Sequence, residues 1–288
     1  MFVHHINAQI SMFGFLSSIH WNIEPEIFRI GGFGLRYYTL CFMLAFFLSY
    51  VILLRIFKKE GKPQELLDQL TIYVFIGTVL GARLGHCLFY EFDYYKNHLL
   101  EMILPIRNVN GHITFTGFQG LASHGGAIGI IIALLLYCRK TKINFWWVAD
   151  RLVIVAALSG AFIRTGNFFN SEIIGKPSDL PWSVVFSQID AIPRHPAQLY
   201  EAIGYLIIFI LLLNLYKQGK HLKPAFLFGC FMVMVFGLRF IVEFVKENQE
   251  AFENSMALNM GQLLSLPFVA IGLYLIFRKR SEVGLKTK

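Results

Sequence analysis

Three arginines lie inside long apolar runs of the sequence, where a charged side chain is costly. Arg83, Arg164 and Arg239 are each flanked on both sides by apolar residues. An arginine at membrane depth costs at least about 3 kcal/mol, so it is found where it has a partner or a task. A guanidinium group donates two parallel hydrogen bonds to a phosphate or a carboxylate. These arginines are therefore candidates for holding an anionic group.

Polar side chains follow two of these arginines at short spacing. Asn167, Asn170 and Glu172 come directly after Arg164, and amides and a guanidinium are good donors for phosphate and glyceryl oxygens. The alternative is a helix terminus whose free carbonyls these side chains cap. Glu243 follows Arg239 by four residues, and a structural ion pair is the plain interpretation of that spacing.

Three further residues could take part in chemistry. His124 opens the run Ser-His-Gly-Gly-Ala, and its imidazole could act as a general base toward a thiol. The alternative is a histidine satisfied within the core. Tyr38 lies at the start of an apolar run, where an aromatic belt is the ordinary expectation. Glu201 follows Pro196 by five residues and could either pair with an arginine or face a site.

The composition sets the class of protein that must position these residues. The chain has 288 residues, of which 56% are hydrophobic and 15% charged, and its mean hydropathy is +0.55. These values indicate a membrane protein. We expect an all-α, polytopic fold with seven transmembrane helices. The expected spans are 35–56, 69–90, 120–138, 149–169, 196–216, 225–245 and 261–277.

The orientation follows from the basic residues between the spans. The connections on one side, with the C-terminal tail, hold 15 Lys and Arg, and those on the other side hold 7. The positive-inside rule then puts the N-terminus outside and the C-terminus in the cytoplasm. Under this topology the polar residues named above fall in the outer halves of their spans. Asp150 and Arg151 start the fourth span at the opposite boundary and are expected to be structural.

We expect one domain over 1–288, with three segments outside the spans. These are an N-terminal surface segment at 1–34, which lacks the features of a removed signal peptide, an outer arm at 91–118 and an outer head loop at 170–195. Loops of this length tend to be functional. Within the second span, Gly77, Gly81 and Gly85 recur once per turn and favour close helix packing.

Several function classes are not supported by the sequence. It contains no P-loop, dinucleotide-binding glycine motif, zinc-protease motif or serine-nucleophile elbow. We therefore expect no cofactor and no metal. The formal charge of +8 is spread in clusters between apolar runs, which favours membrane topology over nucleic-acid binding. Four cysteines lie in apolar stretches and are interpreted as small core residues.

The run Arg164-Thr-Gly-Asn167-Phe-Phe-Asn170-Ser-Glu172-Ile-Ile-Gly175 resembles the signature of the prolipoprotein diacylglyceryl transferases. The resemblance extends over all seven expected spans. It departs from the family in Gly81-Ala-Arg83, where Gly-Gly-Arg is usual, and in residues 1–30, which are longer than expected. The other matching segments are Arg36-Tyr-Tyr38, His124-Gly-Gly, Arg194-His-Pro-Ala-Gln-Leu-Tyr-Glu201, Gly237-Leu-Arg239-Phe-Ile-Val-Glu243 and Met260-Gly-Gln262.

The resemblance implies a reaction and its partners. A diacylglyceryl group would pass from phosphatidylglycerol to the lipobox cysteine of a prolipoprotein signal peptide, with release of glycerol phosphate, as the first step of lipoprotein maturation. The enzyme would lie in the bacterial cytoplasmic (inner) membrane among membrane lipids, with its active site toward the outer leaflet.

The resemblance also implies roles for individual residues. Arg164 and Arg239 would hold the phosphate, and His124 would be the base. Headgroup and thiol would be oriented by a further set, and other residues would support the arginines from behind. The orienting set is Tyr38, Asn167, Asn170, Glu172 and Gly175, and the supporting set is Glu201, Glu243 and Arg83.

Two readings from other classes stay open at this point. The same arginines could form the anion site of a transporter or lipid-binding channel. They could also be ion-paired in a purely structural membrane scaffold, which would tolerate the loss of Arg164.

Overall fold

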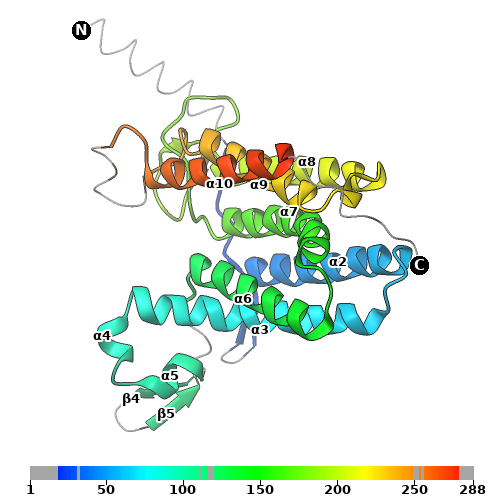
Figure 1. Ribbon diagram of the computed structural model, residues 1–288. Coiled ribbons are helices and arrows are strands. Elements are labelled where there is room, and N and C mark those ends of the chain that lie inside the picture. Colours follow the sequence, from blue (N-terminus) through cyan, green and yellow to red (C-terminus); the bar gives the residue numbers. More distant parts are fainter. Residues whose placement is uncertain are drawn as a thin grey trace, which may run out of the picture. The chain divides into compact units, whose positions relative to one another are not determined.

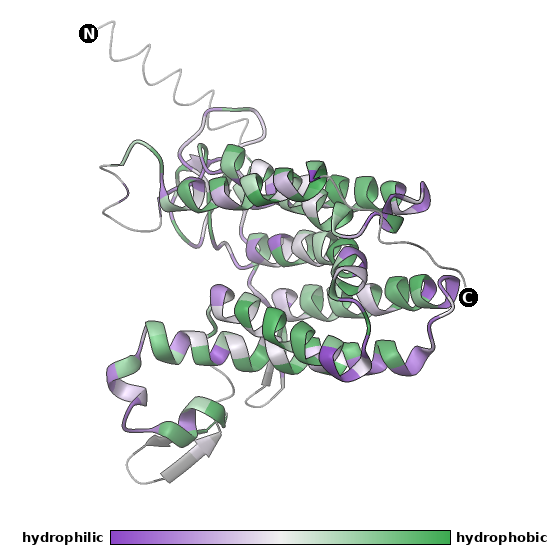
Figure 2. Cartoon of the chain, in the orientation of Figure 1, coloured by the Kyte–Doolittle hydropathy of each residue, from purple (hydrophilic) through white to green (hydrophobic). Residues whose placement is uncertain are grey.

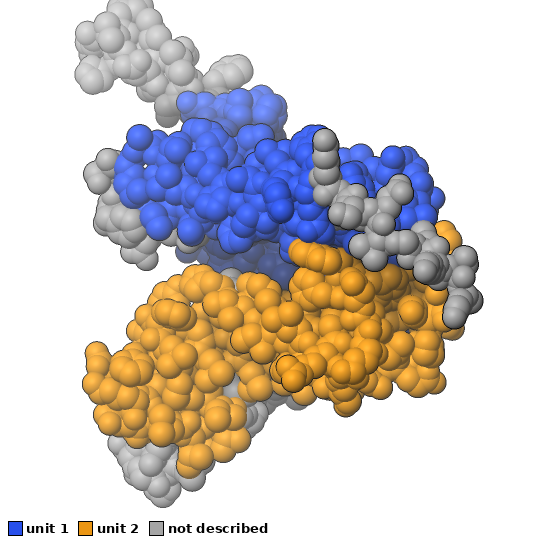
Figure 3. All heavy atoms as spheres, viewed as in Figure 1, with its two compact units in different colours: residues 1–52, 149–288 blue, residues 53–148 orange. Residues whose placement is uncertain are grey.

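The computed structural model describes residues 19–30, 33–104, 106–109, 112–115, 120–248, 253 and 256–278. The chain forms two compact units, coloured separately in Figure 3. The first consists of residues 1–52 and 149–288, and the second of residues 53–148. In sequence, the second unit is therefore an insertion into the first.

The first unit is built mainly from long helices (Figure 1): α7 (Phe145–Phe169), α8 (Ala197–Lys217), α9 (Phe226–Val242), α10 (Met260–Phe277) and most of α2 (Tyr37–Lys59). Helices α8, α9 and α10 pack in sequence order. At Gly229 a Cβ atom would lie 2.9 Å from the carbonyl oxygen of Gly272, so the backbones of α9 and α10 approach closely there. Hydrophobic residues cover most of these helices in Figure 2, as expected for helices surrounded by lipid and by each other.

The helix ends in this unit are set by local sequence. Pro196 directly precedes α8, where its missing N–H is not needed. Asn259 caps α10 and forms a reciprocal capping box with Gln262. Asp150, near the start of α7, accepts hydrogen bonds from the backbone N–H groups of Ala225 (2.7 Å) and Phe228 (2.8 Å) and so caps α9. The structural role expected for Asp150 is confirmed, although the helix it caps is α9.

Short strands complete the first unit. β1 (Ile19–Trp21) pairs in parallel with β6 (Val184–Phe186), which pairs antiparallel with β7 (Pro193–Arg194). β2 (Glu26–Ile30) and β3 (Phe33–Arg36) form an antiparallel hairpin that leads into α2. The all-α expectation did not include these strands, because runs of two to five residues are too short to show an alternating pattern.

The second unit centres on α3 (Gln64–Phe89) and α6 (Ser123–Thr141). A Cβ atom at Gly81 would lie 2.4 Å from the carbonyl oxygen of Gly125, and one at Gly77 would lie 2.6 Å from that of Gly129. No side chain fits at these distances, so the backbones of the two helices touch. The prediction of close packing along the glycine face is confirmed.

The 91–118 segment of the second unit contains α4 (Phe92–Tyr95), α5 (Leu99–Ile103) and a hairpin of β4 (Ile106–Val109) and β5 (His112–Phe115). Arg83 on α3 is buried and holds this segment. Its Nη2 donates to the hydroxyl of Tyr95 (3.0 Å) and to the carbonyl of Glu101 (2.7 Å). Its guanidinium group also lies 4.8 Å from the centre of the Tyr95 ring.

Within the described part of the chain, five helices are long and apolar enough to cross a membrane, namely α2, α3, α7, α8 and α10. Helix α9, with 17 residues, is apolar but shorter. Each of the seven expected spans contains a helix among the described residues. The boundaries differ most at α3, which begins at Gln64 after Pro63, because its first turn is polar and gives no apolar signal.

Candidate active site

A fully buried carboxylate lies against one of the arginines in the first unit. The Nε atom of Arg164, in the last two turns of α7, is 2.9 Å from Oε2 of Glu201 in the second turn of α8. The side chain of Glu201 is 0% exposed and that of Arg164 is 16% exposed. A carboxylate buried this deeply needs a cationic partner, and Arg164 supplies it. One terminal nitrogen of Arg164 also donates to Oδ1 of Asn167 at 3.3 Å.

The residues after Arg164 form a tight turn that brings Glu172 back toward α7. Ser171 and Ile173 both have positive φ, at 55° and 57°, which non-glycine residues adopt only when the surroundings hold them there. The Nδ2 atoms of Asn167 and Asn170 each donate to one carboxylate oxygen of Glu172, both at 3.0 Å. Two amide groups therefore hold the Glu172 carboxylate.

The second arginine belongs to a row of charged residues at the end of α9. Nε of Arg239 lies 3.7 Å from Oε1 of Glu243, and Nζ of Lys246 donates to the same oxygen at 2.8 Å. Lys246 also lies 3.8 Å from Oε1 of Glu201. The side chain of Arg239 is 38% exposed, whereas those of Glu243 and Lys246 are 8% and 4% exposed. Arg239 is thus the most accessible cation of this row.

Helix α10 supports Glu243 from its other side. Nδ2 of Asn259 lies 3.2 Å from Oε2 of Glu243. At Gly261 a Cβ atom would lie 2.5 Å from Oε1 of Glu243, so the carboxylate occupies space that a larger residue would fill. Ion pairs and hydrogen bonds therefore connect Arg164, Glu201, Lys246, Glu243 and Asn259 across four elements. We call this connected set, together with Arg239, the charged row.

Tyr38 lies beside α7 rather than in the charged row itself. A Cβ atom at Gly166 would lie 2.8 Å from Cδ2 of Tyr38 and 3.3 Å from its Cα. The neighbouring Tyr37 stacks on Phe169, with ring centres 4.6 Å apart. The start of α2 therefore packs against the last turns of α7, in the stretch that carries Arg164 and Asn167.

Gly175 lies where two backbones meet. A Cβ atom there would lie 2.4 Å from the carbonyl oxygen of His195 and 2.9 Å from that of Val245. Its N–H donates to the His195 carbonyl at 3.1 Å, and it forms a bridge with Lys246. The structure thus gives Gly175 a packing role next to Lys246.

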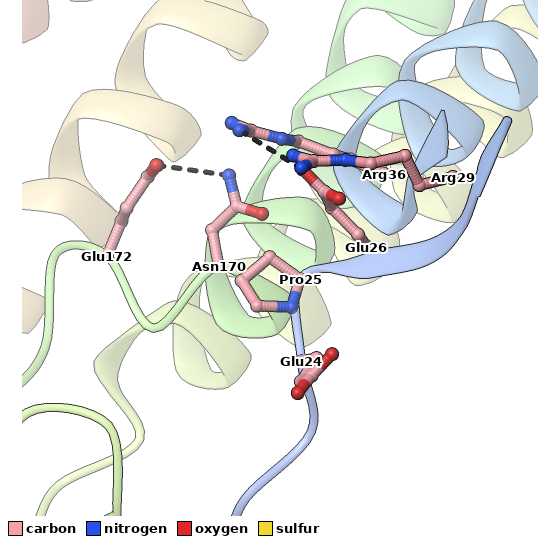
Figure 4. Close-up of a pocket in the computed structure, with 7 residues that line it drawn as sticks. All are labelled: Glu24, Pro25, Glu26, Arg29, Arg36, Asn170 and Glu172. Atoms are coloured by element: carbon pink, nitrogen blue, oxygen red, sulfur yellow. Dashed lines mark hydrogen bonds and ion pairs between the residues drawn. The ribbon is translucent and has the colours of Figure 1, made fainter. Parts of the chain in front are cut away.

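A pocket of about 540 Å³ opens beside Asn170 and Glu172. Figure 4 shows Arg29 and Arg36 of the β2–β3 hairpin close together beside Glu26. Their Nη2 atoms lie 3.0 and 3.7 Å from Oε1 of Glu26. The pocket is lined by Glu24, Pro25, Glu26, Arg29, Arg36, Asn170 and Glu172. It offers guanidinium donors and carboxylate acceptors to a polar ligand that also reaches the 164–175 signature.

His124 and Arg83 belong to the second unit, and Arg83 holds the 91–118 segment there, as described above. His124, at the start of α6, is exposed. Its Nε2 lies 2.9 Å from the hydroxyl of Tyr90, and the two rings stack with centres 6.0 Å apart. Tyr90 in turn stacks on His86, whose Nε2 lies 3.3 Å from Oε1 of Glu91. The histidine proposed as base therefore has a defined hydrogen-bond partner.

Sequence reasoning missed Lys246, Gln198 and Asn259 of the first-unit site. Lys246 was counted only as a loop charge, although Arg239, Glu243 and Lys246 follow the spacing of one helical face, which is a readable signal. Gln198 is fully buried, and its Nε2 donates to the backbone carbonyl of Glu172 at 2.6 Å. Gln198 lies in a segment that matches the family, but its spacing gave no indication of this role, because the residue holds a turn that is distant in sequence.

The 170–195 segment carries two further ion pairs, both made by Arg194. Nε of Arg194 lies 3.1 Å from Oδ2 of Asp190, and its Nη1 lies 2.9 Å from Oε2 of Glu247. The hydrogen bond from Arg194 holds the pKa of Asp190 below its ordinary value. The same bond raises the pKa of Arg194. The Arg194–Glu247 pair connects β7 to the segment that follows α9.

The fold and the charged row define a class, that of helical membrane proteins with guanidinium, carboxylate and amide groups gathered at the ends of apolar helices. Residues 25–278 match the family model of prolipoprotein diacylglyceryl transferase. The chain belongs to the prolipoprotein diacylglyceryl transferase family.

Individual relatives agree with this family. The phosphatidylglycerol–prolipoprotein diacylglyceryl transferase of Bacteroides fragilis is 50% identical over 264 residues, which cover 91% of this chain and 95% of that protein. The protein of the same name from Tolumonas auensis is 46% identical over 265 residues, covering 92% and 98%. That from Chloroherpeton thalassium is 40% identical over 272 residues, covering 94% and 97%. The match therefore includes both units of the fold.

Proposed function

We propose that this protein transfers the diacylglyceryl group of phosphatidylglycerol to the lipobox cysteine of prolipoproteins. The names of its relatives give the donor and the acceptor. The single observation that supports the assignment most strongly is the charged row. It places Arg164 and Arg239 at the ends of apolar helices, linked through Glu201, Lys246 and Glu243. An anionic lipid headgroup is the ligand that such a site suits.

In the proposed reaction, the cysteine sulfur attacks the glyceryl carbon that carries the phosphate. A carbon–sulfur bond forms, the carbon–oxygen bond to phosphate breaks, and its electron pair leaves with glycerol phosphate. Arg164 and Arg239 neutralise the charge that grows on the leaving phosphate. His124 accepts the thiol proton. The diacylglyceryl group is transferred directly to the substrate thiol, so the mechanism uses no enzyme cysteine.

Other side chains would hold the substrates in place. Tyr38, Asn167, Asn170 and Glu172 orient the headgroup and thiol, and the pocket beside Asn170 receives the polar end of a substrate. Glu201 and Glu243 hold the two arginines in position. Gly175 contributes through the close backbone packing it allows rather than through a contact with the lipid.

The proposed topology has seven membrane crossings. All seven helices cross the inner membrane, with the N-terminus outside and the C-terminus in the cytoplasm, so that the charged row faces the outer leaflet. The excess of Lys and Arg in the segments assigned to the cytoplasm supports this orientation. Helix α9 would cross a locally thinned part of the bilayer, because it is short. Cysteines introduced near the two termini and labelled on intact cells test this topology.

The reaction is tested directly by mass spectrometry. Purified protein is incubated with phosphatidylglycerol and a synthetic lipobox peptide, and a diacylglyceryl mass added at the cysteine is the expected product. Arg239→Gln is a suitable inactive control, because Arg239 is partly exposed and its loss leaves Glu243 paired with Lys246. A peptide with serine in place of cysteine should gain no mass. Absence of the adduct with well-folded wild-type protein, together with lipid flux in proteoliposomes, would favour a transporter instead.

The base is tested by pH. His124→Ala should lose most transfer activity near pH 7 and regain part of it at higher pH, where more of the peptide thiol, with an ordinary pKa of about 8.5, is ionised without help. Tyr90→Phe, which removes the hydrogen-bond partner of His124, provides a milder variant of the same test. An equal loss at every pH would show that His124 positions a substrate or supports the fold.

A further inference from the structure

Lys246 is buried at the centre of the charged row. Its Nζ lies 2.8 Å from Glu243 and 3.8 Å from Glu201. Each of those carboxylates also contacts one of the arginines, Glu201 through Arg164 and Glu243 through Arg239. Among the described residues, Lys246 is thus the only side chain that forms ion pairs with both carboxylates.

We propose that Lys246 is a positioning residue of the transferase, which sets the placement and the available charge of the two arginines through the carboxylates it bridges. The inference rests on the proposed function for its substrate. Lys246 itself is 4% exposed at its side chain and needs no contact with the lipid.

The charge balance gives the physical reason. Arg164, Arg239 and Lys246 face Glu201 and Glu243, so the charged row keeps one net positive charge, while the Glu172 carboxylate is held by amides. Without Lys246 the two carboxylates exactly offset the two arginines in number. Each guanidinium group would then be drawn more tightly to its own carboxylate, because attraction between buried charges is weakly screened. Less positive potential would be left for a phosphate.

The backbone around Lys246 is fixed independently of its side chain. Gly175 and Lys246 form an isolated antiparallel bridge. The N–H of Lys176 donates to the carbonyl of Val245 (2.8 Å), and that of Glu247 donates to the carbonyl of Ile174 (3.2 Å). The signature segment therefore positions the backbone of Lys246. This close approach is possible because Gly175 has no Cβ atom. Substituting the side chain alone leaves these backbone hydrogen bonds available.

The test uses Lys246→Met, which keeps the length of the stem and removes the charge. We expect kcat/KM for phosphatidylglycerol to fall about 10- to 100-fold, with a higher KM and a lower kcat, because both ground-state and transition-state binding of the phosphate weaken. Lys246→Arg, which keeps the charge, should recover most of the activity. Lys176→Met is the matched control. Lys176 lies next to the same bridge, but its ammonium donates to the backbone carbonyl of Phe244, and its loss should leave activity unchanged.

A double variant separates charge balance from simple structural support. If Lys246 acts by neutralising Glu243, then Lys246→Met combined with Glu243→Gln should lose less activity than the product of the two single losses. If Lys246→Met cannot be purified in folded form, this double variant should restore folding, because it removes the buried carboxylate that has lost its shortest ion pair. Additive losses, or a double variant that stays unfolded, would overturn the proposal.

The outcomes also separate this inference from the proposed function. Wild-type protein that forms no diacylglyceryl adduct would refute the function itself. Active wild-type protein together with a fully active Lys246→Met variant would refute only the role of Lys246. A fall in activity that Lys246→Arg does not reverse would also overturn it, since the proposal rests on charge.

Discussion

Helix α7 carries buried charge near both of its ends, and the two regions satisfy that charge differently. Near its start, Asp150 is fully buried and accepts two backbone N–H groups at the beginning of α9. Near its end, Arg164 pairs with Glu201, which leads on to Lys246, Glu243 and Arg239. One region pairs a charge with backbone dipoles, and the other pairs side-chain charges with one another.

The difference separates structural from functional use of buried charge. Backbone N–H groups at a helix start are fixed in place, so Asp150 has no ligand to exchange for them. Side-chain ion pairs can reorganise, and a guanidinium group can share its donors between a carboxylate and an incoming phosphate. Arg239, with 38% of its side chain exposed and a 3.7 Å contact to Glu243, is placed for such an exchange.

The largest effect should come from the most accessible arginine. Arg239→Lys keeps the charge but loses the planar fork. The initial rate of adduct formation should fall about 10²- to 10³-fold, as when one preorganised donor to a developing anion is removed. The free energy of unfolding should change by less than about 1 kcal/mol because the site is partly exposed. Rates come from mass spectrometry of the peptide, and near-normal turnover would remove the bidentate role.

The opposite pattern is expected at Asp150. Asp150→Ala removes the cap of α9 and should lower the free energy of unfolding by about 2 kcal/mol. The transfer rate per folded molecule should change less than about twofold, because Asp150 lies near the opposite end of α7 from Arg164. Thermal unfolding in detergent measures the first quantity, and adduct formation normalised to folded protein measures the second. Asp150→Asn, which keeps one acceptor oxygen, should lose about half as much stability. A large rate loss in correctly folded Asp150→Ala would erase the distinction between the two regions.

A smaller effect is expected at the Asp190–Arg194 pair, which lies outside the spanning helices. Arg194 lowers the pKa of Asp190 below its ordinary value of 3.8. A lowered pKa means that the pair stabilises the fold above about pH 4 and that this contribution is lost as the pH falls through the folded-state pKa. Asp190→Asn should therefore cost less than about 1 kcal/mol at pH 7, and the difference from wild type should shrink below about pH 4. Unfolding measured across pH 3–7 checks the trend, which a pH-independent difference would contradict.

The helices could be predicted from sequence because long apolar runs carry a strong signal. Each expected span contains a described helix, and α7 ends at Phe169, as predicted. The close packing of the glycine face of α3 could also be predicted, since residues spaced by four lie on one side of a helix. Polar first turns give no hydropathy signal, and for this reason the predicted start of α3, at residue 69, lies inside a helix that begins at Gln64.

The partners within the site could not be predicted, because they depend on how distant segments meet. Sequence spacing placed Arg239 and Glu243 on one face, but nothing in it indicated that Glu201 pairs with Arg164 or that Lys246 joins both carboxylates. The strands were missed for a related reason, since Ile19–Trp21 takes its pairing from residues 184–186. The orientation of the spans and the roles of individual residues stay predictions.

The parallel pairing of β1 with β6 also constrains the order in which the protein can be assembled. Ile19–Trp21 has no partner strand until Val184–Phe186 has been made. At roughly 5–20 residues per second, the ribosome adds the intervening chain in roughly 10 to 30 s. Both the β2–β3 hairpin and residues Asn170–Glu172 are needed to close the pocket. The pocket is therefore completed only after several helices have been synthesised, so a nascent chain cannot bind a polar ligand there early.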